Sequence, residues 1–180
     1  MTGITRVSKE SIFSDLNNLE VVTTTSDKYA TAFGFTEDEV FESLEKCGLP
    51  GEQEKVKYWY DGFIFGTHQD IYNPWSILNL LDTGKITTYW ANTSSNSLVG
   101  KLLREGNRRI KEKFEALIQG EVIRSPIDEQ IVYNQLDQDD SAIWSLLLAS
   151  GYLKVLSYER EDLMEYGQAP QYELTLTNYE

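Results

Sequence analysis

The feature that most constrains this chain is a helix whose start, apolar face and end are all specified between Thr36 and Gly48. Thr36 and Glu39 have the spacing of a capping box, in which each side chain bonds the backbone N–H of the other residue. Acidic residues in the first turn favour the positive end of the helix dipole. The apolar residues then form one stripe: Val40, Phe41, Leu44 and Cys47. Cys47 is therefore predicted to be a buried core thiol.

The same kind of punctuation predicts further helices along the chain. They span residues 11–18, 54–60, 73–83, 93–105, 107–120 and 139–150. In the third of these, Asn73 is the N-cap and Pro74 the first helical residue. Its sequence is apolar on nearly every side, so we expect that helix to be buried.

The strands predicted from this sequence are few and short. A β-branched run over 19–25 indicates a strand, and residues 63–65 and 70–72 flank a turn at Gly66 as in a hairpin. Residues 121–125 are predicted to be extended, and alternating patterns predict strands over 152–158 and 171–177. The predicted fold class is mainly α with small β elements, an α+β fold.

The charge of the chain limits its partners. It has 29 acidic and 16 basic residues, a net charge of −13, which repels nucleic-acid phosphates and anionic membranes. One local cluster is basic: Lys101, Arg104, Arg108, Arg109, Lys111 and Lys113. It is either a phosphate-binding patch or the outer face of two helices, and we favour the outer face. There is one cysteine and no apolar run of membrane-spanning length or secretory signal, so we expect a cytoplasmic protein without a membrane partner.

The residues needed for common catalytic sites are missing from this sequence. It has no G-x-x-x-x-G-K-[ST] phosphate loop, and no Asp or Glu is followed two positions later by Lys, as in many nucleases. One histidine and one cysteine cannot make a nitrogen- or sulfur-rich metal site, so no metal site is predicted. His68 is expected in an exposed turn rather than as a general base. The acidic residues of 37–45 are expected to form a solvated helix face.

Three dense strings of polar and aromatic residues stand out instead. They are Tyr58-Trp-Tyr-Asp-Gly-Phe63, Tyr72-Asn-Pro-Trp-Ser76 and Tyr89-Trp-Ala-Asn-Thr-Ser-Ser-Asn96. Aromatic residues of this kind are also typical of a core joined to capped helix starts. Together with Gly3-Ile-Thr-Arg6-Val7 and the 11–18 segment, however, they resemble the bacterial AAA-ATPase-like family, whose members often carry a C-terminal PD-(D/E)XK nuclease-like domain.

The resemblance covers nearly the whole chain and implies the C-terminal half of the ATPase-like module. The ATP- and Mg²⁺-binding motifs would then lie upstream and the nuclease-like domain downstream, so no cofactor is expected for this chain alone. Arg6 is implied to face the nucleotide phosphates. The motif residues carried by the resemblance are Tyr60, Asp61, Gly62, Asn73, Pro74, Trp75, Asn92, Thr93 and Ser94. One departure is Asp15, where relatives usually have glycine.

By this resemblance the chain has three parts. Residues 1–25 end the ATPase core, residues 26–125 form a helical lid-like region with a small hairpin, and residues 126–180 resemble a winged-helix unit with a C-terminal helix and β-hairpin. Its partner is the remainder of the ATPase module. The alternative is a non-catalytic module that binds a protein or, less favoured for so acidic a chain, a nucleic acid. Both interpretations predict that this chain alone neither hydrolyses ATP nor cleaves DNA.

Overall fold

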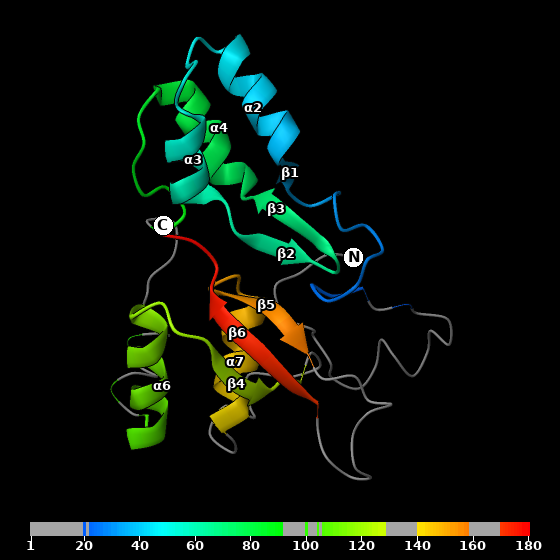
Figure 1. The fold of residues 1–180 in the computed structure, drawn as a ribbon, viewed down its shortest axis with the longest axis vertical. Coiled ribbons are helices and arrows are strands. Elements are labelled where there is room, and N and C mark those ends of the chain that lie inside the picture. Colours follow the sequence, from blue (N-terminus) through cyan, green and yellow to red (C-terminus); the bar gives the residue numbers. More distant parts are fainter. Residues whose placement is uncertain are drawn as a thin grey trace, which may run out of the picture. The chain divides into compact units, whose positions relative to one another are not determined.

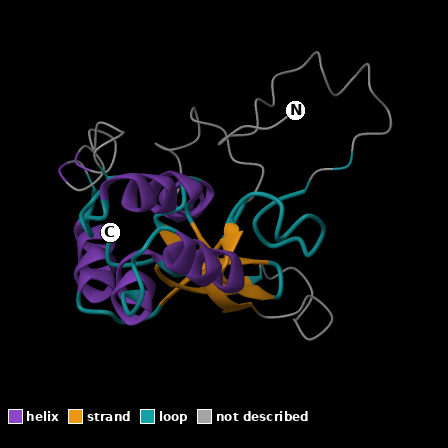
Figure 2. Ribbon diagram, turned by 90° about the horizontal axis from the view of Figure 1, so that it is seen from above, coloured by secondary structure: helices purple, strands orange, loops and turns teal. Residues whose placement is uncertain are grey.

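The computed structural model describes Glu20 and residues 22–91, 100, 104, 106–128, 140–158 and 170–180. These residues contain five helices and two three-stranded antiparallel sheets, so the fold is α+β (Figure 2). They fall into two compact units. The first unit takes residues 24–106 together with the last four, Thr177–Glu180, and the second takes residues 107–176 together with the described residues before Thr24. The boundary at residue 106 precedes the junction near residue 125 that the sequence indicates.

The first unit combines three helices with a small sheet. Its elements in chain order are β1 (Phe35–Thr36), α2 (Glu37–Lys46), α3 (Gln53–Tyr60), β2 (Phe63–Phe65), β3 (His68–Tyr72) and α4 (Pro74–Thr83). The strand order is β1-β3-β2, and β2 and β3 form the predicted hairpin (Figure 1). Residue Phe35 pairs with Tyr72, so the end of β3 reaches the start of α2.

The capping signals of the first unit are confirmed. Thr36 accepts a hydrogen bond from the Glu39 backbone, and the Glu39 carboxylate accepts one from the Thr36 N–H at 2.9 Å. Asn73 caps α4 through a 2.8 Å bond from the Trp75 N–H, with Pro74 at the first position. The helices then bury one continuous core: Val40, Leu44, Val56, Tyr60, Tyr72, Ile77 and Leu80.

The prediction that Cys47 is a core thiol is wrong, because its side chain is exposed. Helix α2 ends at Lys46, and Cys47 is the C-cap residue with φ −89° and ψ 5°. Its N–H still bonds the Ser43 carbonyl at 3.0 Å, but the buried residues of this helix are Val40 and Leu44. The apolar spacing in the sequence continues to Cys47, one residue beyond the end of the helix.

Two further expectations need correction in the first unit. Helix α4 is buried on one side only, because Trp75 is 52% exposed and Leu78 is 54% exposed. Its packed side is formed by Ser76, Ile77 and Leu80. The β-branched run was predicted to be a strand through residue 25, but Thr24 and Thr25 lie in a turn. In that turn the Thr24 carbonyl accepts a hydrogen bond from the Gly66 N–H at 2.8 Å. The turn therefore supports the end of the hairpin.

The second unit places two helices with a three-stranded sheet. Its elements are α6 (Arg108–Ile118), β4 (Ile123–Pro126), α7 (Asp140–Ala149), β5 (Leu153–Tyr158) and β6 (Gln171–Leu176). Strand β6 lies between the other two, giving the order β4-β6-β5 (Figure 1). Asn107 caps α6 through a 3.0 Å bond from the Ile110 N–H. Ile118 is the last residue of α6 and is exposed.

The core of the second unit centres on α7. Every residue from Ala142 to Leu148 is buried, and the Trp144 ring lies 5.1 Å from that of Phe114 on α6. The Lys113 ammonium lies 5.6 Å from the centre of the Trp144 ring and donates to the Arg124 carbonyl at 2.6 Å. Burial of large apolar side chains is the main source of stability of such a unit.

Some predictions lie outside the described residues. They include Arg6, the 11–18 helix, and the motif residues Asn92, Thr93 and Ser94. Lys101 of the basic cluster also lies outside them. On α6, Arg108, Arg109 and Lys111 are exposed, as either interpretation of the cluster requires, whereas Lys113 is half-buried and lies against the Trp144 ring. Arg108 pairs with Glu112 of the same helix at 2.7 Å.

Candidate functional site

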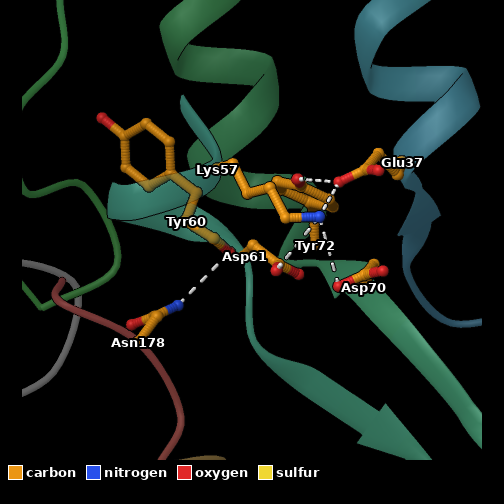
Figure 3. Close-up of polar contacts among 7 residues, drawn as sticks. All are labelled: Glu37, Lys57, Tyr60, Asp61, Asp70, Tyr72 and Asn178. Carbon is orange, nitrogen blue, oxygen red and sulfur yellow. Dashed lines mark hydrogen bonds and ion pairs between the residues drawn. The ribbon is translucent and has the colours of Figure 1, made fainter. Parts of the chain in front are cut away.

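Three acidic side chains of the first unit converge on Lys57 in the last turn of α3 (Figure 3). The Lys57 ammonium contacts Glu37 most closely, lies 3.4 Å from Asp70 Oδ1, and lies 4.0 Å from Asp61 Oδ2. Glu37 comes from the first turn of α2, Asp61 directly follows α3, and Asp70 lies on β3. We call these residues, with Tyr72, the Lys57 cluster. It ties three elements of the first unit together.

Hydrogen bonds and burial fix the protonation states in the Lys57 cluster. The bond to Glu37 is the main reason that the pKa of Lys57 is raised, with the charges of Asp70 and Asp61 adding to it. Burial is the main reason that the pKa of Tyr72 is raised, and the nearby negative charges add to this effect. The Tyr72 hydroxyl donates to Glu37 at 3.2 Å. A lysine that acts as a base or nucleophile needs a lowered pKa. Lys57 is instead held as a structural cation.

The sequence predicted that the acidic residues of 37–45 form a solvated helix face. Glu37 does not belong to such a face. Its side chain is 30% exposed and pairs with Lys57, twenty positions along the chain. The position also suits a carboxylate because Glu37 is the first residue of α2, where the helix dipole is positive. The prediction remains right for Glu42, which is exposed and pairs with Lys46 at 2.6 Å on the surface of the same helix.

Tyr60, the first residue of the Tyr-Asp-Gly motif, is a buried anchor. Its hydroxyl donates to the Thr87 carbonyl at 2.6 Å and accepts from the Thr87 N–H at 2.9 Å. Burial raises the pKa of Tyr60 to about 12, with the Thr87 bond acting in the opposite direction. The phenol thus replaces both hydrogen bonds that the Thr87 backbone would otherwise make with water.

Residues Thr177–Glu180, which we call the tail, lie on the surface formed by the polar-aromatic strings. The Asn178 amide donates to the Tyr60 carbonyl at 3.3 Å (Figure 3). The Tyr179 ring lies 5.0 Å from the Tyr58 ring and 5.1 Å from the Trp59 ring, the second pair edge to face. Offset and edge-to-face aromatic pairs at such distances are attractive. The first polar-aromatic string therefore contacts the tail both through its Tyr58 and Trp59 side chains and through the backbone of Tyr60.

The tail ends in a carboxylate held by three donors. Ser76 donates its hydroxyl to Glu180 Oε2 at 2.6 Å, and the Trp90 N–H donates to Oε1 at 2.5 Å. The N–H of Tyr89 also donates to Oε1. The three donors belong to the second and third polar-aromatic strings, whose sequences gave no sign of a shared partner. The Asn-Pro-Trp-Ser and Tyr-Trp strings thus meet at one acidic side chain.

The structure thus shows where the predicted motif residues lie. Asp61 is in the Lys57 cluster, and Gly62 is buried with φ +143° as the chain turns from α3 towards β2. Asn73 and Pro74 start α4, and the Trp75 side chain is largely exposed. His68 is exposed at the first position of β3, next to the turn.

Sequence reasoning missed the residues that join these motifs, namely Lys57, Asp70, Ser76, Tyr179 and Glu180. Only the pairing of Lys57 with Asp61 had a local signal, the four-residue spacing. The other contacts join residues far apart in the chain, up to 104 positions for Ser76 and Glu180. No periodicity or motif reports such pairs.

The described residues offer little for ligand chemistry elsewhere. A shallow pocket of about 280 Å³ in the first unit is lined by Leu49, Glu52, Lys55, Leu80, Gly84 and Ile86. Small-molecule sites are usually larger, about 300–1,000 Å³. Over the described ranges, no group of three or more histidine, cysteine or acidic side chains is arranged to hold a metal ion. The helices that the structure describes are all too short or too polar to span a bilayer.

Comparison with known proteins gives one informative match. An uncharacterized protein encoded in the vnfD 5′ region of Azotobacter chroococcum mcd 1 is 27% identical over 181 residues. The match covers 100% of this chain and 32% of that protein, so the chain spans about a third of the length of this relative. No family model matches the chain. No solved structure matches it either.

The raised pKa values predict a loss of stability in alkaline solution. Above pH 10 the unfolded chain loses tyrosine and lysine protons that the folded chain retains at Tyr60, Tyr72 and Lys57, so rising pH favours unfolding. For Tyr60 the shift to about 12 corresponds to at most about 2.7 kcal/mol near that pH. Urea unfolding between pH 8 and 11 is expected to show a shallower decline in Tyr60→Phe than in the parent. Exposed Tyr29→Phe is the control, and an unchanged slope in Tyr60→Phe would contradict the assignment.

Proposed function

We propose that this chain is the lid and winged-helix-like part of a larger P-loop ATPase and is non-catalytic on its own. The observation that carries the second half of the proposal is the path of the second unit. Over its described residues it runs helix, strand, helix, strand, strand, with the order β4-β6-β5. A winged-helix unit has the same strand order, in which the first strand pairs with the last and the final two strands form the wing, although it has two helices between its first and second strands.

The chemistry of α7 favours a protein-packing role over DNA reading. In a winged-helix protein that binds DNA, the helix before the wing enters the major groove. Here that helix is α7, whose sequence Asp140–Ala149 has no lysine or arginine and whose residues 142–148 are buried. Contacts with DNA rely heavily on basic side chains. The partner we propose is the rest of the ATPase module.

The first half of the proposal rests on the family resemblance. Its Tyr-Asp-Gly, Asn-Pro-Trp and Asn-Thr-Ser residues match the ATPase-like motifs in order, and Arg6 matches a position that faces the nucleotide. ATP and Mg²⁺ would bind in a preceding segment. A relative three times as long is compatible with such a segment. A single cysteine, which allows no disulfide within the chain, is compatible with the cytoplasmic location that we propose.

The perturbed groups of the described chain also favour a structural role. Lysine and tyrosine pKa values are raised at Lys57, Tyr60 and Tyr72, and carboxyl pKa values are lowered at Asp27, Glu42 and Glu173. Each shift reinforces the charge state that the group already has at neutral pH. General acids and bases need the opposite, a pKa brought towards the working pH.

Two measurements test the proposal. The purified chain with Mg²⁺ and ATP is expected to release no phosphate above buffer, and to form no complex with duplex DNA at 100 mM salt. Phosphate release that disappears in Arg6→Ala, or a stable DNA complex, would contradict the proposal.

The second measurement is the ATPase activity of the full-length protein encoded by the gene. If this protein carries a P-loop upstream, Arg6→Ala is expected to lower kcat by about 10³-fold or more, as for arginines that stabilise the transferred phosphoryl group. Arg109→Ala, which removes an exposed arginine of α6, is the control with unchanged kcat. An upstream sequence without a P-loop would favour the alternative, a non-catalytic protein-interaction module.

A further inference from the structure

The tail is held by contacts of the kind that proteins use to recognise peptide segments. The Glu180 N–H donates to the Trp59 carbonyl at 3.3 Å, and the Asn178 amide reaches the next carbonyl, that of Tyr60. Between them, the Tyr179 ring packs against two aromatic rings. Backbone contacts set the register of a bound segment, and contacts with alternate side chains select its sequence.

The carboxylate end of this surface is a built anion site. Tyr89 and Trp90 supply two consecutive backbone N–H groups, an arrangement that favours a negative charge. The third donor, Ser76, lies in the first turn of α4 and is 0% exposed. Hydrogen bonds from several donors to one carboxylate are stronger than bonds between neutral groups. Without the carboxylate, the buried Ser76 hydroxyl and the two N–H groups would lose an acceptor, which is costly.

We propose that the first unit contains a recognition site for a peptide segment of the form Asn-aromatic-Glu, and that the tail is the ligand this site holds in cis. The tail makes a backbone bond from the Glu180 N–H to the Trp59 carbonyl, and its residues belong to no strand, so the tail can detach without breaking the ladder of either sheet. A partner presenting an aromatic residue followed by glutamate competes for the same donors. The inference does not depend on the proposed ATPase role.

Tethering explains why the tail occupies the site by default. A ligand on a short linker has an effective concentration of roughly millimolar, so a free peptide must be at least that concentrated to compete. A test in trans therefore needs a full-length chain with a weakened tail. Tyr179→Ala combined with Glu180→Ala removes the ring and the carboxylate and leaves the backbone donors in place.

The first experiment measures amide hydrogen exchange by NMR in the full chain. Glu180→Ala is expected to speed exchange at the Tyr89 and Trp90 amides at least tenfold. Glu180→Gln, which keeps the shape and one acceptor oxygen, is expected to give a smaller increase. Glu54→Ala removes an exposed acid of α3 and is the matched control for charge. Unchanged exchange at both amides in Glu180→Ala and Glu180→Gln would overturn the site.

The second experiment adds the peptide Thr-Asn-Tyr-Glu, with an amidated end, at millimolar concentration to the Tyr179→Ala/Glu180→Ala chain. We expect at least half of the lost protection to return at the Tyr89 and Trp90 amides. The same peptide with the Glu180→Gln change is expected to restore much less. Failure of the first peptide, or equal effects of both, would overturn recognition of the acidic side chain. Exchange at the buried Val56 and Leu80 amides reports that the first unit remains folded.

Discussion

Trp144→Ala is expected to lower the free energy of unfolding by about 3–5 kcal/mol, as found for large aromatic side chains removed from cores. Trp144 is 1% exposed, and its ring packs on Phe114. Alanine would leave a cavity at the centre of the second unit and would also remove the ring that lies against the Lys113 ammonium. Urea unfolding followed by circular dichroism measures the loss.

The chain supplies a control of the same residue type. Trp75 on α4 is 52% exposed, so Trp75→Ala removes less buried area and is expected to cost under about 1 kcal/mol. The two variants make the same chemical change at different burial. Equal losses of stability would contradict the assignment of Trp144 to the core of the second unit.

The second large effect is expected from Gly66→Ala, at the hairpin turn between β2 and β3. Gly66 has φ +58°, which costs an alanine about 1–2 kcal/mol. A Cβ there would also lie 2.3 Å from Asp27 Oδ1 and 2.7 Å from the Asp27 backbone nitrogen. Forced overpacking typically adds about 1–3 kcal/mol, so we expect a total loss of about 2–5 kcal/mol in urea unfolding.

Asp27 cannot move away from Gly66 without further losses. Its Oδ1 accepts from the Thr67 N–H at 2.6 Å and from the Thr67 hydroxyl at 2.9 Å. Gly48→Ala is the matched control, because Gly48 has φ +75° and nothing within 4 Å of an added Cβ. It is expected to lose only the backbone part, about 1–2 kcal/mol. A Gly66→Ala loss no larger than that of Gly48→Ala would show that the turn yields to the added methyl group.

Local signals predicted most of the elements because they act between residues a few positions apart. The Thr36–Glu39 capping box and the Asn73-Pro74 start each satisfy N–H groups within one helical turn, and both are confirmed. The hairpin around Gly66 and the helix with two following strands at the C-terminal end were also predicted within a few residues. Errors arose where burial depends on neighbours. The 73–83 helix was expected to be buried because its sequence is apolar on nearly every side, but Trp75 and Leu78 are exposed.

The candidate sites depend on contacts that local patterns do not carry. Lys57 pairs with Glu37 on another helix and with Asp70 on a strand, so its role emerges only when three elements pack. In the sequence, Glu180 is one acidic residue among 29, whereas in the structure its carboxylate is bound by donors 90 to 104 positions earlier. The polar-aromatic strings contribute to the surface that the tail contacts, but their sequences do not show that the chain itself covers it.

The tail has a consequence for how the chain folds during synthesis. The first unit is discontinuous in sequence, since residues 107–176 are made between its main part and Thr177–Glu180. At about 5–20 residues per second, Tyr89 and Trp90 are synthesised on the order of ten seconds before Glu180. During that interval water must solvate the donors that later hold the carboxylate. The first unit therefore reaches its full stability only after translation of the entire second unit.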